Sequence, residues 1–158
     1  MFDLSLELKI LNRKKIKEIL ALIKKQWDSD FRTELVFLIN EKNKIFLVNK
    51  KIFDLELEKL KINSIGLYFG ELKNNELRLS IEGSQLIGKD AKQNLVELNE
   101  KQAMQWLKGR DIDIKGQYNG FVILKHKNDL LGTGKYKDGK VLNFVPKARR
   151  FKYNLETE

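Results

Sequence analysis

The stretch 134–141 holds the residues that come closest to a known chemical motif. Its glycines and Lys140 match the start of the GxxxxGK loop that binds nucleotide phosphates. Val141 follows where that loop needs Ser or Thr to hold magnesium, and the next residues are β-rich although the loop should enter a helix. Asp138 followed by Gly139 is a strong signal for a hairpin turn. We therefore predict a β-hairpin here and no nucleotide site.

Few side chains of this sequence have the chemistry that catalysis needs. The absence of cysteine excludes disulfides, zinc fingers, iron–sulfur clusters and thiol nucleophiles, and one histidine, His126, excludes a multi-histidine metal site. We interpret His126 as a lone surface residue. The carboxylate pairs Asp111/Asp113 and Glu56/Glu58 have no partner histidine and no glycine-rich frame. We predict no catalytic residues, no cofactor and no metal, and therefore a protein that is not an enzyme.

The positive charge is concentrated toward the end of the sequence. The 158 residues contain 31 basic and 22 acidic side chains, a formal net charge of +9. Residues 105–158 hold twelve of the basic and six of the acidic side chains, and residues 135–152 hold seven basic side chains and one acid. Such a focus attracts polyanions by counterion release, as nucleic-acid-binding proteins do. The alternative is an ordinary solvated lysine-rich surface.

The first part of the chain reads as an α+β unit. Asn12 can cap a helix in which apolar residues recur at helical spacing up to Trp27. Two hairpins follow, and between them Asp54 can cap a short helix. The last strand of the second hairpin is expected to run from Glu76 to Ile81, with a single helical turn after it. The predicted strands are 35–39, 45–48, 65–72 and 76–81, and the turn is 84–88.

The second part reads as a small closed β-barrel with one helix. Asn99 and Gln102 have the spacing of a capping box, and Gly109 can end that helix. Gly132 and Gly134 permit a bulge or a close approach of another backbone, which in a basic protein includes a phosphate backbone. The predicted strands are 95–98, 120–124, 130–136 and 141–145.

These units predict two domains, residues 1–90 and residues 91–158, joined tightly because the only proline is Pro146 and no Gly/Ser-rich linker occurs. Apolar residues make up 42% of the sequence, enough for a packed core. No apolar run has the length of a membrane span, and the N-terminus lacks a signal-peptide layout. We expect a soluble, cytoplasmic protein that does not contact membranes.

Aromatic residues are interleaved with the basic cluster. Exposed rings can stack on unpaired bases, whereas buried rings fill a barrel. We expect Phe144 to be buried and leave both possibilities open for Tyr136 and Tyr153. The aromatic residues in question are Tyr118, Tyr136, Phe144, Phe151 and Tyr153.

The order and spacing of several segments resemble a pre-PUA domain followed by a PUA domain, an RNA-binding barrel. The whole layout is similar to small ribosome-biogenesis factors of large-subunit assembly. The ending also resembles the C-terminal region of Nol/Nop/Sun (Fmu-like) RNA cytosine methyltransferases. The segments that carry the resemblance are 65–72, 77–84, 106–109, 120–123, 130–135 and 142–150.

The resemblance implies a non-enzymatic protein that binds structured rRNA or tRNA in ribosome biogenesis or RNA modification, and we expect it to be a monomer. Those methyltransferases use a cysteine thiolate and S-adenosylmethionine, so this cysteine-free sequence should not perform their reaction. The alternative function is an adaptor that recruits an RNA methyltransferase or an assembly factor in trans. The implied RNA-binding face comprises the helix, the glycine-bearing strand and the last strand. Together with the neighbouring lysines, we predict these RNA-binding residues: Lys108, Arg110, Gly132, Gly134, Lys135, Lys137, Lys140, Lys147, Arg149 and Arg150.

Overall fold

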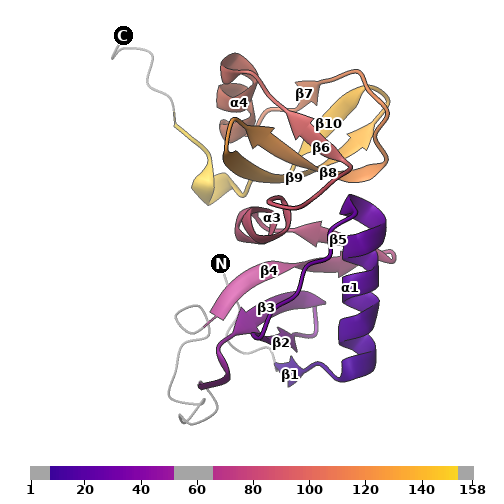
Figure 1. The fold of residues 1–158 in the computed structure, drawn as a ribbon. Helices are drawn as coiled ribbons and strands as arrows, with labels where there is room; N and C mark the ends of the chain where they lie inside the picture. The colour runs from indigo at the N-terminus through magenta and orange to yellow at the C-terminus, as the bar shows by residue number, and fades with distance from the viewer. Residues whose placement is uncertain (1–7, 52–65, 153–158) are drawn as a thin grey trace.

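The computed structural model describes residues 8–51 and 66–152. The strands among these residues form two five-stranded sheets (Figure 1). The predicted helix at Asp54 lies outside these residues. Within them, no helix is long and apolar enough to cross a membrane. The first sheet is antiparallel, in the order β1 (Lys9–Ile10), β2 (Val36–Ile39), β3 (Lys44–Val48), β4 (Gly66–Lys73), β5 (Glu76–Leu79). The second has the order β6 (Leu95–Glu97), β8 (Gly120–His126), β9 (Asp129–Lys137), β10 (Lys140–Asn143), β7 (Ile112–Asp113).

Helix α1 (Arg13–Trp27) covers one face of the first sheet (Figure 1). It begins as predicted, because the Asn12 side chain accepts a hydrogen bond from the Lys15 backbone N–H at 2.9 Å. Ile19, Ile23 and Trp27 are fully buried against the sheet. The apolar stripe therefore faces the core, and the lysines of the helix lie largely on its wet side.

The connection after β5 differs from the prediction. We expected the strand to continue to Ile81, but it ends at Leu79, and α3 (Ile81–Ile87) begins two residues later. Ser80 causes the early start, because its side chain caps the new helix by accepting a hydrogen bond from the Gly83 N–H at 2.9 Å. The prediction that the apolar–polar alternation continues as a strand to Ile81 was therefore wrong at the end of the strand.

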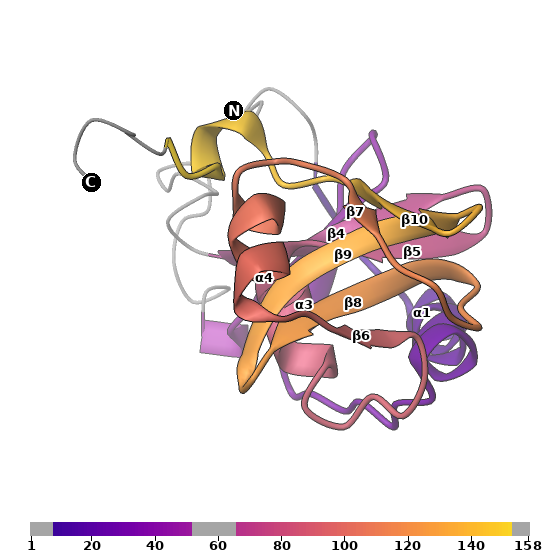
Figure 2. The same cartoon turned by 90° about the horizontal axis from the view of Figure 1, so that it is seen from above.

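The second sheet curls around its own core, which contains α4 (Glu100–Leu107) (Figure 2). The predicted capping box is present: Gln102 N–H donates to Asn99 Oδ1 at 2.8 Å, and Asn99 N–H donates to Gln102 Oε1 at 3.0 Å. Strand β6 pairs with β8 in parallel, and the other pairs are antiparallel. The predicted α+β fold with a barrel-type second unit is confirmed, but the sheet is a curled half-barrel and not the closed barrel that we expected, because its edge strands β6 and β7 do not pair within the described residues. The buried members of this core are Val96, Leu98, Ala103, Trp106, Ile112, Val122, Leu124, Val141 and Val145.

Strand β8 contributes to both cores. Val122 and Leu124 point into the curled sheet, whereas Phe121 and Ile123 belong to the cluster that α1 forms with the first sheet. Because successive side chains of a strand point to opposite faces, both faces of β8 are buried. This explains why its sequence is a continuous apolar run and does not alternate.

Hydrogen bonds also join the two units. Trp27 Nε1–H donates to the Phe121 carbonyl at 3.2 Å, and the Thr133 hydroxyl donates to the Leu79 carbonyl at 2.9 Å. Helix α3 lies between the two units (Figure 1). The boundary proposed at residue 90 lies between α3 and β6, where the chain passes from the first sheet to the second.

Candidate nucleic-acid interface

The end of α4 and the segment that follows β10 are hydrogen-bonded to each other. The Asn143 side chain donates to the carbonyls of Trp106 (2.8 Å) and Arg110 (2.9 Å), and the Phe151 N–H donates to the Leu107 carbonyl at 2.8 Å. Carbonyls at a helix end need such partners. Asn143 was not predicted from the sequence, although a polar residue within the apolar run 141–145 was a usable signal. The bonds bring together five of the predicted residues, which we call the tail cluster: Lys108, Arg110, Lys147, Arg149 and Arg150.

Gly109 makes room for Arg150 within the tail cluster. The Arg150 guanidinium Nε–H donates to the Val145 carbonyl at 3.0 Å, which holds the side chain over Gly109. A Cβ atom on Gly109 would lie 2.4 Å from Arg150 Cδ, and the φ of Gly109 is +91°. Glycine is therefore required here both by the backbone conformation and by the close approach of a cationic side chain.

Arg149 is engaged within the protein. Its guanidinium forms two contacts of 2.8 Å with the Glu82 carboxylate of α3. Partial burial raises the pKa of Glu82, but the hydrogen bond from Arg149, the backbone hydrogen bond of Glu82 and the Arg149 charge outweigh it and lower the pKa below its ordinary value. Arg149 therefore ties the tail to the first unit, and its charge is compensated before any ligand arrives.

The remaining predicted cations belong to the β9–β10 hairpin. Lys135 contacts Glu76 at 2.8 Å and lies 4.7 Å from the centre of the Phe121 ring. Lys137 and Lys140 pair across the turn, and Lys140 is 3.9 Å from Asp113. The tip of this hairpin and the tail lie at opposite ends of the second sheet (Figure 2). The predicted cations thus form two separate groups instead of one continuous face.

Gly132 and Gly134 lie in the interior. The Gly132 N–H donates to Ser84 Oγ at 3.0 Å, its φ is +98°, and the pairing of β8 with β9 shifts register beside it. A Cβ atom on Gly134 would lie 2.5 Å from Trp106 Cη2. The bulge and the close approach expected at these glycines both occur, but the approaching atoms belong to the protein.

No metal-binding cluster accompanies these groups, because the described residues contain no group of three or more His, Asp or Glu side chains that could hold a metal. His126 is half-buried, and its Nδ1 is 2.9 Å from the Leu98 carbonyl, so this nitrogen donates to the oxygen and links the ends of β8 and β6. The GxxxxGK stretch forms the predicted hairpin, with Asp138 and Gly139 both at positive φ.

The aromatic residues divide into exposed and engaged rings. Phe144 was expected to be buried, but 39% of it is exposed, because it follows the end of β10. The Arg78 guanidinium lies over its ring, 4.8 Å from the ring centre. The Tyr136 hydroxyl donates to the Gly116 carbonyl at 3.1 Å. Phe151 is 52% exposed beside the tail cluster, and Tyr153 lies outside the described residues. Phe151 is thus the ring best placed for stacking next to the tail cluster.

Comparison with known proteins shows what the second unit is similar to. Residues 93–151 match the family model described as the methyltransferase RsmF PUA domain. This segment is similar to that domain, and we call it the PUA domain below. The match extends from before β6 to Phe151, so the tail cluster lies inside the PUA domain. The resemblance of this part of the sequence to a PUA domain and to the C-terminal region of such RNA methyltransferases is confirmed.

Curated relatives of this chain carry the name ribosomal RNA small subunit methyltransferase F. The protein of that name from Vibrio cholerae is 29% identical over 92 residues, which are 58% of this chain and 20% of the relative. That of Shewanella woodyi is 31% identical over 91 residues (56% and 19%). That of Aliivibrio fischeri is 21% identical over 126 residues (76% and 27%), so similarity extends beyond the PUA domain. The chain spans only about a fifth to a quarter of the length of these relatives.

Proposed function

We propose that this chain binds RNA through the tail cluster of its PUA domain and acts in rRNA modification or a related step of ribosome biogenesis. One observation carries the proposal. The segment that resembles rRNA methyltransferases is also the most basic part of the sequence, with seven basic side chains and one acid in residues 135–152. Neutralising phosphates with such side chains releases counterions and drives binding to RNA.

The contacts of the tail cluster support two different roles for its residues, binding of phosphate and attachment of the tail to the first unit. Arg150 packs on Gly109, whose chain neighbours are Lys108 and Arg110, and Lys147 begins the short helix η3 (Lys147–Arg149) directly before Arg150. We assign these four cations to phosphate contacts and Arg149 to the tie with Glu82. The exposed Phe151 ring beside them can stack on an unpaired base.

The proposed role of this chain is binding without methyl transfer. Cytosine methylation of the kind that the sequence resemblance implies requires a cysteine thiolate, and this sequence contains no cysteine. We therefore propose that a separate RNA methyltransferase or assembly factor acts on the RNA that this chain holds. The proposed ligand is structured RNA, because the similarity to PUA domains implies RNA binding through the barrel.

The test removes three cations of the tail cluster in one variant, Lys108→Ala with Arg110→Ala and Lys147→Ala. Its affinity for a fluorescein-labelled RNA hairpin with a single-stranded extension is measured by fluorescence anisotropy across a salt series. Binding should weaken about tenfold or more, and the slope of log affinity against log salt should fall by about 2, since each lost phosphate contact removes about 0.7–0.9.

The matched control removes three cations from the far end of the first unit, Lys9→Ala with Arg13→Ala and Lys17→Ala. All three residues are exposed, and the net charge changes by the same amount. Equal affinities of the two variants would overturn the assignment of the tail cluster, because a general charge effect would then explain all of the loss.

A further inference from the structure

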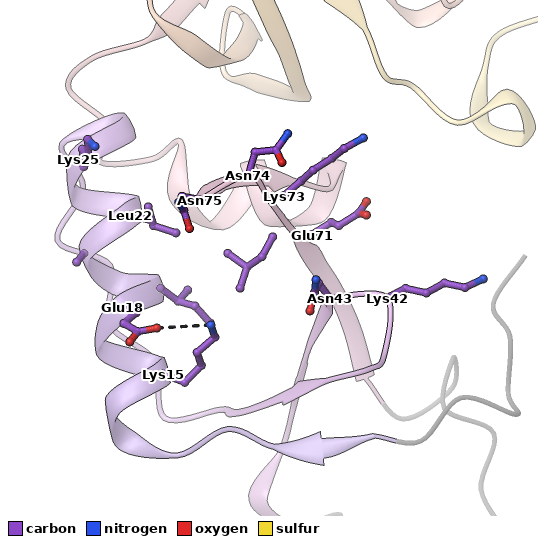
Figure 3. A pocket seen from close by; sticks show the side chains of 13 residues that line it. Lys15, Glu18, Leu22, Lys25, Lys42, Asn43, Glu71, Lys73, Asn74 and Asn75 are labelled. Atoms are coloured by element: carbon purple, nitrogen blue, oxygen red, sulfur yellow. Dashed lines mark ion pairs between the residues drawn. The ribbon is translucent and has the colours of Figure 1, made fainter.

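A trough runs along the side of the molecule that carries α1. Its first part is a hollow of about 770 Å³ between α1 and the tips of the two hairpins of the first sheet (Figure 3). Its second part, about 400 Å³, continues between α1, the β4–β5 turn and strands β8 and β9. Leu22, Lys25 and Asn75 line both parts, so the two hollows form one surface that reaches from the first unit to the PUA domain.

Lysines stand on both rims of the first hollow. Lys15 and Lys25 come from α1, whereas Lys42 and Lys73 extend outward from the two hairpin tips (Figure 3). Lys15 is 3.5 Å from Glu18. Within the described residues, Lys25, Lys42 and Lys73 have no carboxylate partner. Three uncompensated cations from three separate elements thus border the same hollow.

The acidic side chains of the trough are neutralised inside the protein. Glu71 lies 2.7 Å from the Arg78 guanidinium, and Glu76 lies 2.8 Å from Lys135. Because each lining carboxylate already has a cationic partner, the charge left for a ligand is positive. This surface is therefore complementary to a polyanion and repels a cationic partner.

Asparagines add hydrogen-bonding capacity to the hairpin tips. Asn43, Asn74 and Asn75 have φ values of 62°, 53° and 60°, a conformation that asparagine adopts more readily than most residues. Within the described residues their side-chain amides make no hydrogen bond of their own. They can donate to phosphate and sugar oxygens and accept from bases, the contacts that fix a nucleic acid in place.

The trough ends on the PUA domain. Lys135 and Tyr136 of β9 line its second part, together with Asn119. The β9–β10 hairpin tip, with Lys137 and Lys140, lies on the same side of the molecule as α1 in both views (Figures 1 and 2). Of the predicted cations that the tail cluster leaves out, Lys135 lines the trough, and Lys137 and Lys140 belong to the same hairpin.

We infer that the trough binds a second stretch of RNA backbone, which passes from the hairpin tips of the first unit, along α1, to the β9–β10 hairpin of the PUA domain. The inference rests on the proposed function because it takes RNA as the ligand, but it uses none of the tail-cluster residues. One RNA would then contact two sides of the molecule, the tail cluster with one segment and the trough with another.

The test removes the three uncompensated cations in one variant, Lys25→Ala with Lys42→Ala and Lys73→Ala. The same labelled hairpin RNA with its single-stranded extension serves as the probe, and the Lys9/Arg13/Lys17 variant is again the matched control. Affinity should fall about tenfold and the salt slope by about 2, while the thermal midpoint stays at that of the control, because the substitutions keep the backbone and the three side chains form no ion pair within the described residues.

The outcomes separate this inference from the proposed function. Affinity equal to that of the control overturns the trough, and the tail-cluster variant then still tests the proposed function alone. A weakened trough variant beside an unaffected tail-cluster variant supports the trough and overturns the tail-cluster assignment. Binding of polyglutamate at matched charge with the affinity of the RNA would also overturn the inference, because the surface would then select acidity and not RNA.

Discussion

Gly134 lies where a side chain would enter the core of the PUA domain. A Cβ atom there would be 2.4 Å from Val141 Cγ1 and 2.5 Å from Trp106 Cη2. The Trp106 indole is held in that position by a 2.9 Å hydrogen bond to the Leu131 carbonyl, so it cannot move aside freely. Glycine at 134 is therefore explained by packing, without any contact to RNA.

We expect Gly134→Ala to destabilise the protein by about 1–3 kcal/mol through overpacking, and to leave the RNA affinity of the folded fraction unchanged. Thermal unfolding and anisotropy measure the two effects separately. Gly139→Ala is the comparison, since its φ is +78° but nothing lies within 4 Å of the added methyl group. A Gly134→Ala protein of full stability that binds RNA poorly would instead place this glycine at the RNA surface.

At the scale of elements, the Arg149–Glu82 pair joins the tail to α3. The lowered pKa of Glu82 means that the folded state holds the ionised carboxylate more tightly than the unfolded chain does. Its contribution to stability is therefore complete above the ordinary value of 4.5 and is lost as the pH falls through the lower folded value. The pair is partly exposed, so the contribution is about 1 kcal/mol or less.

We expect Arg149→Ala to lower the thermal midpoint at neutral pH and to reduce the loss of stability on acidification below pH 4.5. Glu82→Gln should have the same effect, and the double variant should add little to either single variant, because both remove one interaction. Additive losses in this double-mutant cycle would show that the two side chains act independently. RNA affinity should change less than on removal of the other tail-cluster cations.

Elements specified by neighbouring residues were predictable, and contacts between distant elements were not. The Asn12 cap, the Asn99–Gln102 capping box and the Asp138-Gly139 turn each depend on residues within a few positions. The pairs Arg149–Glu82 and Lys135–Glu76 join residues 67 and 59 positions apart. Local patterns contain no information on such pairings, so the sequence predicted the basic residues but not their division into two groups.

At the scale of the whole molecule, the two units share a core. Phe121, Ile123 and Leu130 of the PUA domain pack in one cluster with residues of α1 and the first sheet, such as Ile19 and Phe69. The area buried between the sheets belongs to neither unit alone. The positions of the tail cluster and the trough relative to each other are therefore fixed by packing, as one RNA bound to both surfaces would require.

This shared core predicts a single cooperative unfolding transition. The chain contains two tryptophans, Trp27 in α1 and Trp106 in α4, and both are fully buried. With 5-fluorotryptophan incorporated, their two fluorine resonances report each unit separately, and both should disappear at one temperature. Ile19→Val removes a methyl group from the first unit at a cost of about 0.5–1.5 kcal/mol.

The midpoints of both fluorine signals should then fall together, by about 2–4 °C for each kcal/mol lost. A control substitution on the surface, Lys17→Ala, should leave both unchanged. If only the Trp27 signal moved, the PUA domain would fold by itself, and the spacing of the two proposed RNA surfaces would depend on how the units dock. Coincident shifts mean that a defect in the shared core weakens the scaffold of both proposed RNA surfaces at once, because Phe121, Ile123 and Leu130 of the second unit belong to that core.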